Sequence, residues 1–169
     1  GELRGAPTPR IDALAAQGMR FLNFNVESDC VPTRSALMTG RHPIRTGALQ
    51  SVPAGLPQGI HPWEITIAQL LSQAGYATAM YGKWHLGDNY PYRPEDRGYT
   101  EVLRHGGGGV GQTPDYWDNA YFDGSYWHNG KPTPVKGFCT DVFFESAKNF
   151  IRTSKQQGQP FLAYIATNA

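Results

Sequence analysis

The chain repeats one pattern three times: a stretch with helical periodicity is followed by an apolar run typical of a β-strand. The helical stretches are residues 9–17, 66–74 and 140–153, and the apolar runs are 19–26, 76–81 and 160–167. Gly18 and Gly75 end the first two helical stretches, where glycine is a natural stop. Helices that feed apolar strands favour an α/β fold, with a mostly parallel sheet flanked by helices. The run 160–167 is almost wholly apolar, which predicts a strand buried on both faces.

The remaining segments are shorter or less regular. Pro32 suits the first turn of a helix, and Gly40 is a stop, so we expect a further helix over 32–39. Residues 41–62 are rich in proline and glycine and predict a loop. Residues 88–136 have little periodicity and many aromatic side chains, so no regular element is predicted there. Thr140 or Asp141 is the expected cap of the helix at 140–153.

Length and charge limit the classes of protein to consider. The chain has 169 residues, which fits one domain, and a formal net charge of +1 with its basic residues scattered. This argues against nucleic acid or an anionic membrane as the main partner. No apolar run approaches the roughly 20 residues of a membrane span. The sequence opens at Gly1 without a signal peptide and stops after a strand-like run, so we expect an internal piece of a longer protein.

Cys30 stands where a helix begins, and Arg34 follows four positions later. Unpaired N–H groups and the helix dipole make such a position suitable for an anion. Arg34 returns to the same helical face and adds donors that suit sulfate, phosphate or carboxylate. The alternative is a buried cysteine followed by an ordinary surface arginine. A cysteine phosphatase is excluded, because its phosphate loop needs five residues between the cysteine and the arginine and this chain has three.

A second candidate cluster follows the run 76–81. In an extended segment, Lys83 and His85 would point to the same side and Trp84 to the other. Lysine offers a compact cation for an oxyanion, and histidine offers proton transfer near neutral pH. The alternative is that these residues form a half-exposed strand end and have no catalytic or binding role.

These motifs together resemble the type I sulfatases, enzymes with an alkaline-phosphatase-like fold. Residues 30–34 (CVPTR), leading to 39–41 (TGR), resemble the first signature of that family, and residues 75–87 (GYATAMYGKWHLG) resemble the second. Residues 94–99 and 160–169 resemble segments further along the family's domain. The resemblance therefore covers residues 1–169 as a partial catalytic domain, the amino-terminal half without the first strand.

The resemblance implies an arylsulfatase-like sulfuric ester hydrolase. Cys30 would be oxidised to Cα-formylglycine by a formylglycine-generating enzyme, which is the expected partner during maturation. One hydroxyl of the hydrated aldehyde would attack sulfur, and the second would let the sulfate ester collapse by elimination. Arg34 would lie beside this group, Lys83 would bind the sulfate, and His85 would hydrogen-bond the hydroxyl and act as base. The substrate would be a sulfated small molecule or glycan.

The family's metal is Ca²⁺, with Mg²⁺ as the alternative, held by an Asp-Asp pair and an Asp-Asn pair. Both pairs would fall outside this chain, so Cys30, as formylglycine, is the one metal ligand expected within it. Asp29 could substitute as a ligand, but a helix cap is the favoured reading. The isolated 169-residue piece is therefore expected to bind metal poorly and to be nearly inactive. By the same resemblance, the protein is expected to be periplasmic or secreted.

Other residues remain open. His105 precedes four glycines and could contact substrate, or it could belong to a flexible surface loop. Asp115, Tyr116, Trp117, Trp127 and His128 could stack on a sugar or aryl ring, or they could pack the core of a loop.

His42 and His61 lie beside prolines and are expected to be solvated. Cys139 is expected to be a buried thiol, although one bridge to Cys30 is chemically conceivable.

Two further readings of function stay open. One is a hydrolase of phosphate or phosphonate esters with the same fold. The other is a binding module that keeps the fold but leaves Cys30 unmodified and has no activity.

Overall fold

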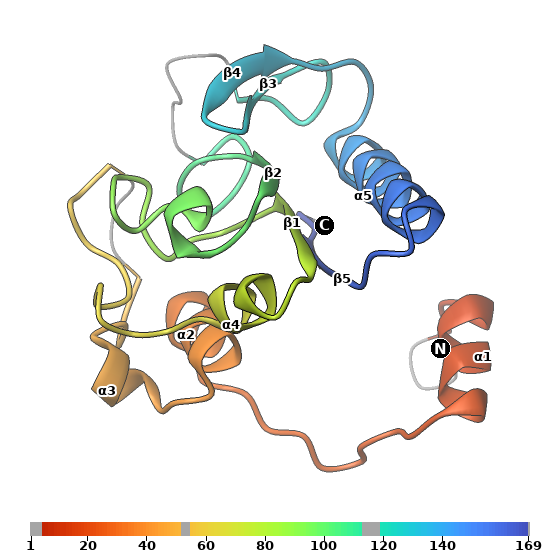
Figure 1. Ribbon diagram of the computed structural model, residues 1–169, viewed down its shortest axis with the longest axis horizontal. Coiled ribbons are helices and arrows are strands. Elements are labelled where there is room, and N and C mark those ends of the chain that lie inside the picture. Colours follow the sequence, from red (N-terminus) through yellow and green to blue (C-terminus); the bar gives the residue numbers. More distant parts are fainter. Residues whose placement is uncertain (1–4, 52–54, 113–118, 169) are drawn as a thin grey trace.

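The computed structural model describes residues 5–51, 55–112 and 119–168, and it contains a five-stranded mixed sheet (Figure 1). The central strand β1 (Ala77–Gly82) pairs in parallel with β2 (Glu101–Arg104) on one side and β5 (Phe161–Ala166) on the other. A hairpin of β3 (Ser125–His128) and β4 (Lys131–Pro134) extends the sheet antiparallel to β2. The strand order is β4-β3-β2-β1-β5. The parallel centre agrees with the α/β expectation, and the hairpin adds two antiparallel strands to it.

Helices cover both faces of the sheet. α5 (Cys139–Gln156) packs against β1 and β5 on one face. The opposite face carries α4 (Ile67–Gln73), with α2 (Cys30–Thr39) and the single turn α3 (Pro43–Thr46) beside it.

The alternation of side chains along β1 creates two hydrophobic clusters. Met80 joins Val31, Trp84 and Tyr99 on the α2 and α4 side. Tyr81 points to the other side, into the cluster formed with α5. The core is therefore split by the sheet, as expected for a layered α/β domain.

Local sequence explains where several helices begin and end. Thr66 caps α4 through its side chain and forms a capping box with Gln69. Asp29 is the N-cap of α2, and Gly40 ends that helix in the left-handed conformation, with φ 66°. Pro9–Gln17 form α1, with the predicted bounds.

The three parallel strands end at one edge of the sheet. Gly82 lies opposite Arg104 on β2 and Ala166 on β5. The residues that follow these strands therefore converge at this edge, where ligands commonly bind in open α/β sheets. In this chain the strands lead directly into Lys83 and His105.

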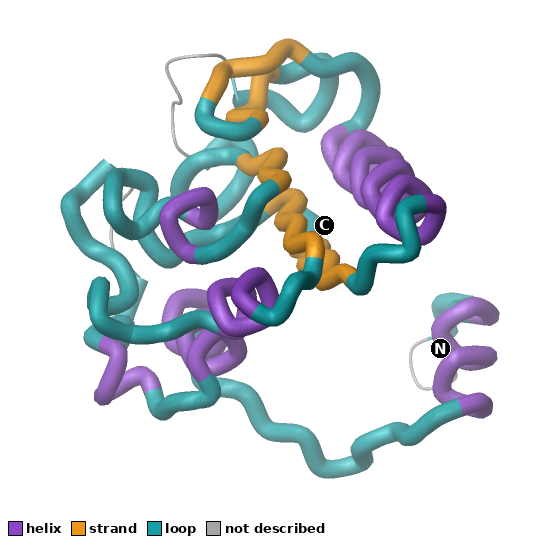
Figure 2. The backbone as a smooth tube through the Cα atoms, viewed as in Figure 1, coloured by secondary structure: helices purple, strands orange, loops and turns teal. Residues whose placement is uncertain are grey.

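The predicted strand at 19–26 is wrong. The segment lies apart from the sheet as a coil that connects α1 to α2 (Figure 2). Its apolar side chains are exposed, with Leu22 at 84% and Phe24 at 71%. An apolar run becomes a strand only when a neighbour pairs with its backbone, and within the described ranges 19–26 has no such neighbour.

The segment 88–136 is more regular than predicted. It contains the 3₁₀ helix η2 (Pro94–Arg97) as well as β2, β3 and β4. Each of these strands has four residues, too few to show alternation, and β4 contains two prolines. Within 41–62, the single turn α3 was likewise not predicted.

Two smaller predictions also fail. β5 is only partly buried, because it has one partner strand and forms the sheet edge among the described strands. α5 begins at Cys139 with Phe138 as N-cap and no side-chain cap. The Thr140 hydroxyl instead donates to the Asn168 carbonyl at 2.9 Å.

No helix within the described ranges combines the length and apolar character that crossing a bilayer requires.

Candidate active site

Asp29 and Ser51 hold the start of α2. The Asp29 carboxylate accepts the Cys30 backbone N–H at 2.6 Å and the Ser51 hydroxyl at 2.8 Å. These hydrogen bonds, the one from Ser51 first, lower the pKa of Asp29 to about 2. Asp29 therefore carries its negative charge at the helix N-terminus, where the dipole favours it. This geometry confirms its role as helix cap.

The Cys30 side chain lies within a small polar cluster. Its Sγ atom is 3.2 Å from Nδ1 of His85, 3.2 Å from Oδ1 of Asp29 and 3.3 Å from Oγ of Ser51. Cys30 is half-buried, and both it and Cys139 are free thiols. The contact between Cys30 and His85 joins the two sequence motifs at one point.

His85 reaches Cys30 by a backbone turn rather than by an extended strand. β1 ends at Gly82, and His85 has a φ of 57°, which is uncommon for a residue other than glycine. The premise of an extended 83–85 segment is therefore wrong. Trp84 does turn away from the site: it is 1% exposed and its Nε1 donates to the Tyr92 carbonyl at 2.8 Å. Backbone strain of this kind concentrates at functional sites.

Burial and positive neighbours favour the neutral form of His85. Desolvation lowers its pKa most, and the charges of Lys83 and Arg34 lower it further. Asp88 and Asp29 act in the opposite direction. A neutral imidazole can accept a proton, which a general base must do.

Arg34 is fixed by two oxygen atoms at the same edge of the sheet. Its Nη1 donates to the Lys83 carbonyl and to the Tyr164 hydroxyl, both at 2.8 Å. Its Nε is buried without a hydrogen-bond partner in the part of the chain that the structure describes. The guanidinium is thus held in place by two hydrogen bonds, and one of its donors has no partner among the described residues.

The positive charge of Lys83 acts on two histidines. Its charge lowers the pKa of both His85 and His105. Its backbone N–H donates to the Ala166 carbonyl at 2.8 Å, which fixes the first residue after β1 against the end of β5. The structure therefore brings Cys30 into contact with His85 and places that ring within reach of the charges of Arg34 and Lys83, whereas the catalytic roles of the four residues stay a prediction.

His105 is placed differently from the expected substrate contact or flexible loop. It is 1% exposed, with Nδ1 2.8 Å from the Gly106 carbonyl and Nε2 2.9 Å from Nδ2 of Asn168. Since a carbonyl only accepts, Nδ1 carries the proton and Nε2 accepts from Asn168. Burial is the main cause that lowers the His105 pKa to about 4. Both ring nitrogens are occupied, which argues against direct contact with substrate.

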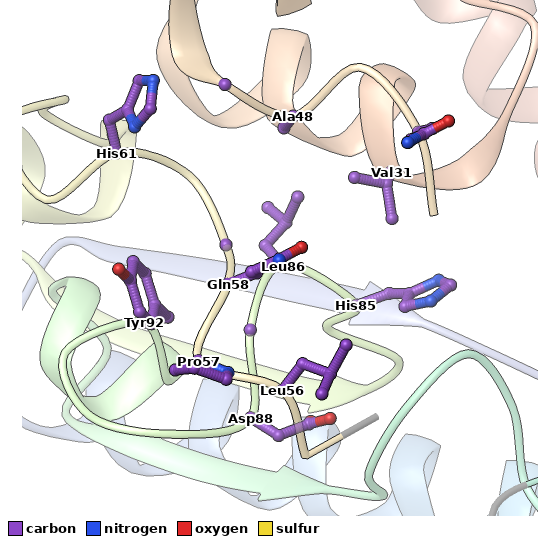
Figure 3. Close-up of a pocket in the computed structure, with 14 residues that line it drawn as sticks. Val31, Ala48, Leu56, Pro57, Gln58, His61, His85, Leu86, Asp88 and Tyr92 are labelled. Atoms are coloured by element: carbon purple, nitrogen blue, oxygen red, sulfur yellow. The ribbon is translucent and has the colours of Figure 1, made fainter. Parts of the chain in front are cut away.

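A cavity of about 300 Å³ opens beside His85 (Figure 3). Its walls come from the start of α2, the loop after α3 and the turn that follows His85. The polar and aromatic side chains that line it are Gln50, Gln58, His61, His85, Asp88 and Tyr92. His61 stacks on Trp63, with ring centroids 4.2 Å apart, and is only partly exposed rather than solvated as expected.

The described residues do not form a complete site for a divalent cation. No group of three or more histidine, cysteine, aspartate or glutamate side chains within 5–51, 55–112 and 119–168 could hold one. The Asp29 carboxylate is already occupied by Cys30 and Ser51. Calcium, with residue 30 as one ligand, remains a prediction for the full-length protein.

The candidates for stacking on a sugar or aryl ring lie away from the Cys30–His85 contact or outside the described residues. Asp115, Tyr116 and Trp117 lie outside the described residues. Trp127 and His128 lie in β3, and His128 is 2.7 Å from the Glu101 carboxylate at the surface.

His42 and Cys139 behave as the sequence predicted. The His42 side chain is 84% exposed, which confirms the prediction that it is solvated. Cys139 is fully buried, which confirms the prediction of a buried thiol.

Sequence reasoning missed four residues that hold the site. Tyr164 fixes Arg34, Ser51 contacts Cys30, Asn168 contacts His105, and Asp88 lies beside the pocket. No motif identifies Ser51 or Tyr164. Asn168 follows the last predicted strand, and Asp88 follows the glycine that ends the second motif, so position alone could have suggested both.

Comparison with known proteins points to one family. The family model described as Sulfatase matches residues 2–169. Rat (Rattus norvegicus) arylsulfatase G is 32% identical over 94% of this chain and 35% of its own length. Human (Homo sapiens) arylsulfatase A is 49% identical over 57% of this chain and 20% of its own length.

Solved structures agree. The crystal structure of Ps i-CgsB has a TM-score of 0.73 at 32% identity, over 83% of this chain and 34% of that one. The structure of BT4656 in complex with its substrate D-glucosamine-2-N,6-O-disulfate has a TM-score of 0.71 at 28% identity, over 94% of this chain and 28% of that one. The chain spans about a third of the length of the curated relatives that match it along nearly all its residues.

Proposed function

The chain belongs to the sulfatase family, and on that premise we propose that the full-length protein is a sulfuric ester hydrolase whose reaction is centred on residue 30. The observation that carries the proposal is the 3.2 Å contact between Cys30 Sγ and His85 Nδ1 beside Arg34 and Lys83. A nucleophile and a base are therefore in contact, and the charges of two cations act on the same ring.

The family's modified residue fits this position. The Sγ atom of Cys30 stands where an oxygen of the hydrated formylglycine would lie, within reach of His85, Asp29 and Ser51. When present, the hydrated aldehyde supplies a hydroxyl nucleophile and a second hydroxyl through which sulfate is released.

The chain's own residues have separable roles in this proposal. Arg34 and Lys83 bind and orient the sulfate oxygens, which carry negative charge throughout the reaction. His85, kept neutral by burial and by these cations, accepts a proton from the side chain of residue 30. Asp29 keeps residue 30 at the end of α2.

The cavity beside His85 suits a hydroxylated ring. Glutamine amides and the rings of His61 and Tyr92 line it, and such groups together hydrogen-bond hydroxyls and pack against a sugar face. BT4656 has a disulfated glucosamine as its substrate, which supports the same class of ligand here. We infer a sulfated carbohydrate as the substrate, and a formylglycine-generating enzyme as the maturation partner. The expectation of a periplasmic or secreted location rests on the family resemblance.

Mass spectrometry and hydrolysis assays test this function. The full-length protein, coexpressed with a formylglycine-generating enzyme, should lose from residue 30 the mass of one sulfur and two hydrogens less one oxygen. It should then release sulfate from sulfated sugars or aryl sulfates faster than phosphate from matched aryl phosphates. Cys30→Ala should abolish this activity, while the matched control Cys139→Ala should retain it.

Three outcomes would contradict the proposal. An unmodified residue 30 would favour a binding module. Faster hydrolysis of the phosphate ester would favour the phosphatase reading. Full activity of Cys30→Ala would exclude residue 30 as the nucleophile.

A further inference from the structure

Asp88 connects three segments around the candidate active site, although no motif assigns it a role. Its carboxylate oxygens accept the Gly107 backbone N–H at 3.2 and 3.3 Å. Oδ2 also accepts the Gly55 backbone N–H at 3.4 Å. Asp88 itself belongs to the turn that follows His85, so one carboxylate ties this turn to two loops distant in sequence.

Arg104 forms an ion pair with the Asp88 carboxylate. It is 3% exposed at the end of β2, with Nη1 3.6 Å from Oδ1 of Asp88 and Nε 3.6 Å from Oε2 of Glu95. A buried arginine between two carboxylates has little freedom to move, because each displacement would leave a charge unpaired. Asp88 is therefore anchored to the sheet.

The glycine loop 106–109 that Asp88 holds lies directly against His85. A Cβ atom built on Gly108 would be 2.9 Å from Cε1 of the His85 ring and 3.2 Å from Nε2. Real Cβ atoms do not approach this closely, so Gly108 is in contact with the ring. Nδ1 of the same ring contacts Cys30.

We propose that Asp88 is a positioning residue: by holding the glycine loop 106–109 through Gly107, it clamps the His85 imidazole between Gly108 and residue 30. Asp88 acts through the loop and not on the reacting atoms. The kinetic part of the proposal rests on the proposed sulfatase function, whereas the structural part does not.

Kinetics of the full-length protein test the proposal with Asp88→Asn. The asparagine side chain keeps one oxygen as acceptor. It loses the negative charge that pairs with Arg104 and the second oxygen that accepts from the Gly107 N–H. Since misplacement of a catalytic group by about 1 Å can cost on the order of 100-fold in rate, we expect kcat to fall by about that factor with KM nearly unchanged. Asp96→Asn is the matched control, because Asp96 also pairs with an arginine, Arg93, and accepts its backbone N–H. The control should keep wild-type kcat.

A double mutant separates positioning from general stability. Gly108→Ala should disturb the same ring from the loop side and lower kcat similarly. If both changes act through one clamp, the double mutant should be little worse than either single mutant. If the losses in kcat of the two single mutants multiply in the double mutant, the proposal is overturned. A raised KM with unchanged kcat in Asp88→Asn would also overturn it, since that pattern indicates direct contact with substrate.

Amide hydrogen exchange supplies a measurement that does not require activity. In Asp88→Asn the Gly107 amide should exchange faster than in wild type, while amides of α5 stay unchanged. Unchanged Gly107 exchange would overturn the role of Asp88 even if sulfatase activity is present. A different result is also possible: the wild-type protein lacks sulfatase activity, yet the Gly107 amide exchanges faster in Asp88→Asn than in wild type. That result would refute the proposed function but would support the role of Asp88 in holding the loop.

Discussion

Sγ of Cys30 and Nδ1 of His85 lie 3.2 Å apart although 55 residues separate them in the chain. The first belongs to the start of a helix and the second to the turn after the central strand. This contact joins the two sequence motifs at one point and is the geometric basis of the proposed reaction.

His85→Gln should lower kcat/KM of the full-length protein by about 10²- to 10⁴-fold, the usual contribution of a general base. Glutamine occupies similar volume but cannot accept the proton. Steady-state kinetics on an aryl sulfate checks this. His42→Gln is the control, because the His42 side chain is 84% exposed. A loss below threefold for His85→Gln would contradict its role as base.

Tyr164→Phe should weaken substrate binding more than turnover. The change removes the 2.8 Å hydrogen bond from Arg34, and a hydrogen bond to a charged group contributes about 1.5–3 kcal/mol. The guanidinium would keep its bond to the Lys83 carbonyl, so we expect KM to rise about tenfold while kcat changes little. Tyr76→Phe, at a more exposed tyrosine, should leave both constants unchanged. Equal effects of the two substitutions would argue against this role of Tyr164.

The protein should become less stable as pH falls from about 6.5 to about 4. The pKa of His105 is about 4 in the folded state, below the usual value of 6.5. The unfolded chain therefore binds a proton in this range that the folded chain does not, so stability falls as pH decreases. Thermal melting across this range measures the effect, and His105→Gln should reduce its slope. An unchanged slope in the variant would show that other groups cause the acid sensitivity.

Arg97→Met should destabilise the domain by about 3 kcal/mol. Arg97 is 3% exposed and its guanidinium donates to the backbone carbonyls of Pro62 and Glu64. The Glu64 carbonyl, whose hydrogen bond to Arg97 is buried, would be left without a donor, and such a loss costs about 1–3 kcal/mol. Urea unfolding gives the measurement. Arg93→Met should cost under about 1 kcal/mol, because its ion pair with Asp96 lies nearer the surface. Similar losses for both variants would contradict this account of Arg97.

Local sequence predicts the elements whose signals lie within them. The bounds of α1 and the ends of α2 and α4 follow from proline, capping residues and glycine within a few positions. Such signals act over one or two helical turns, so no knowledge of distant partners is needed. The contact between Cys30 and His85 could also be anticipated, because each residue belongs to one of the two motifs.

Tertiary structure decides what depends on partners distant in the chain. The apolar run 19–26 remains a coil because no described strand pairs with it, whereas the short strands β2 and β3 form because each has a partner. The turn that brings His85 to Cys30, the fixing of Arg34 by Tyr164 and the burial of His105 likewise arise from contacts across the sheet. The sequence alone therefore determined which groups are present and where α1, α2 and α4 end. Their distances, burial and proton affinities were decided only by the fold, because these properties depend on the atoms that surround each group.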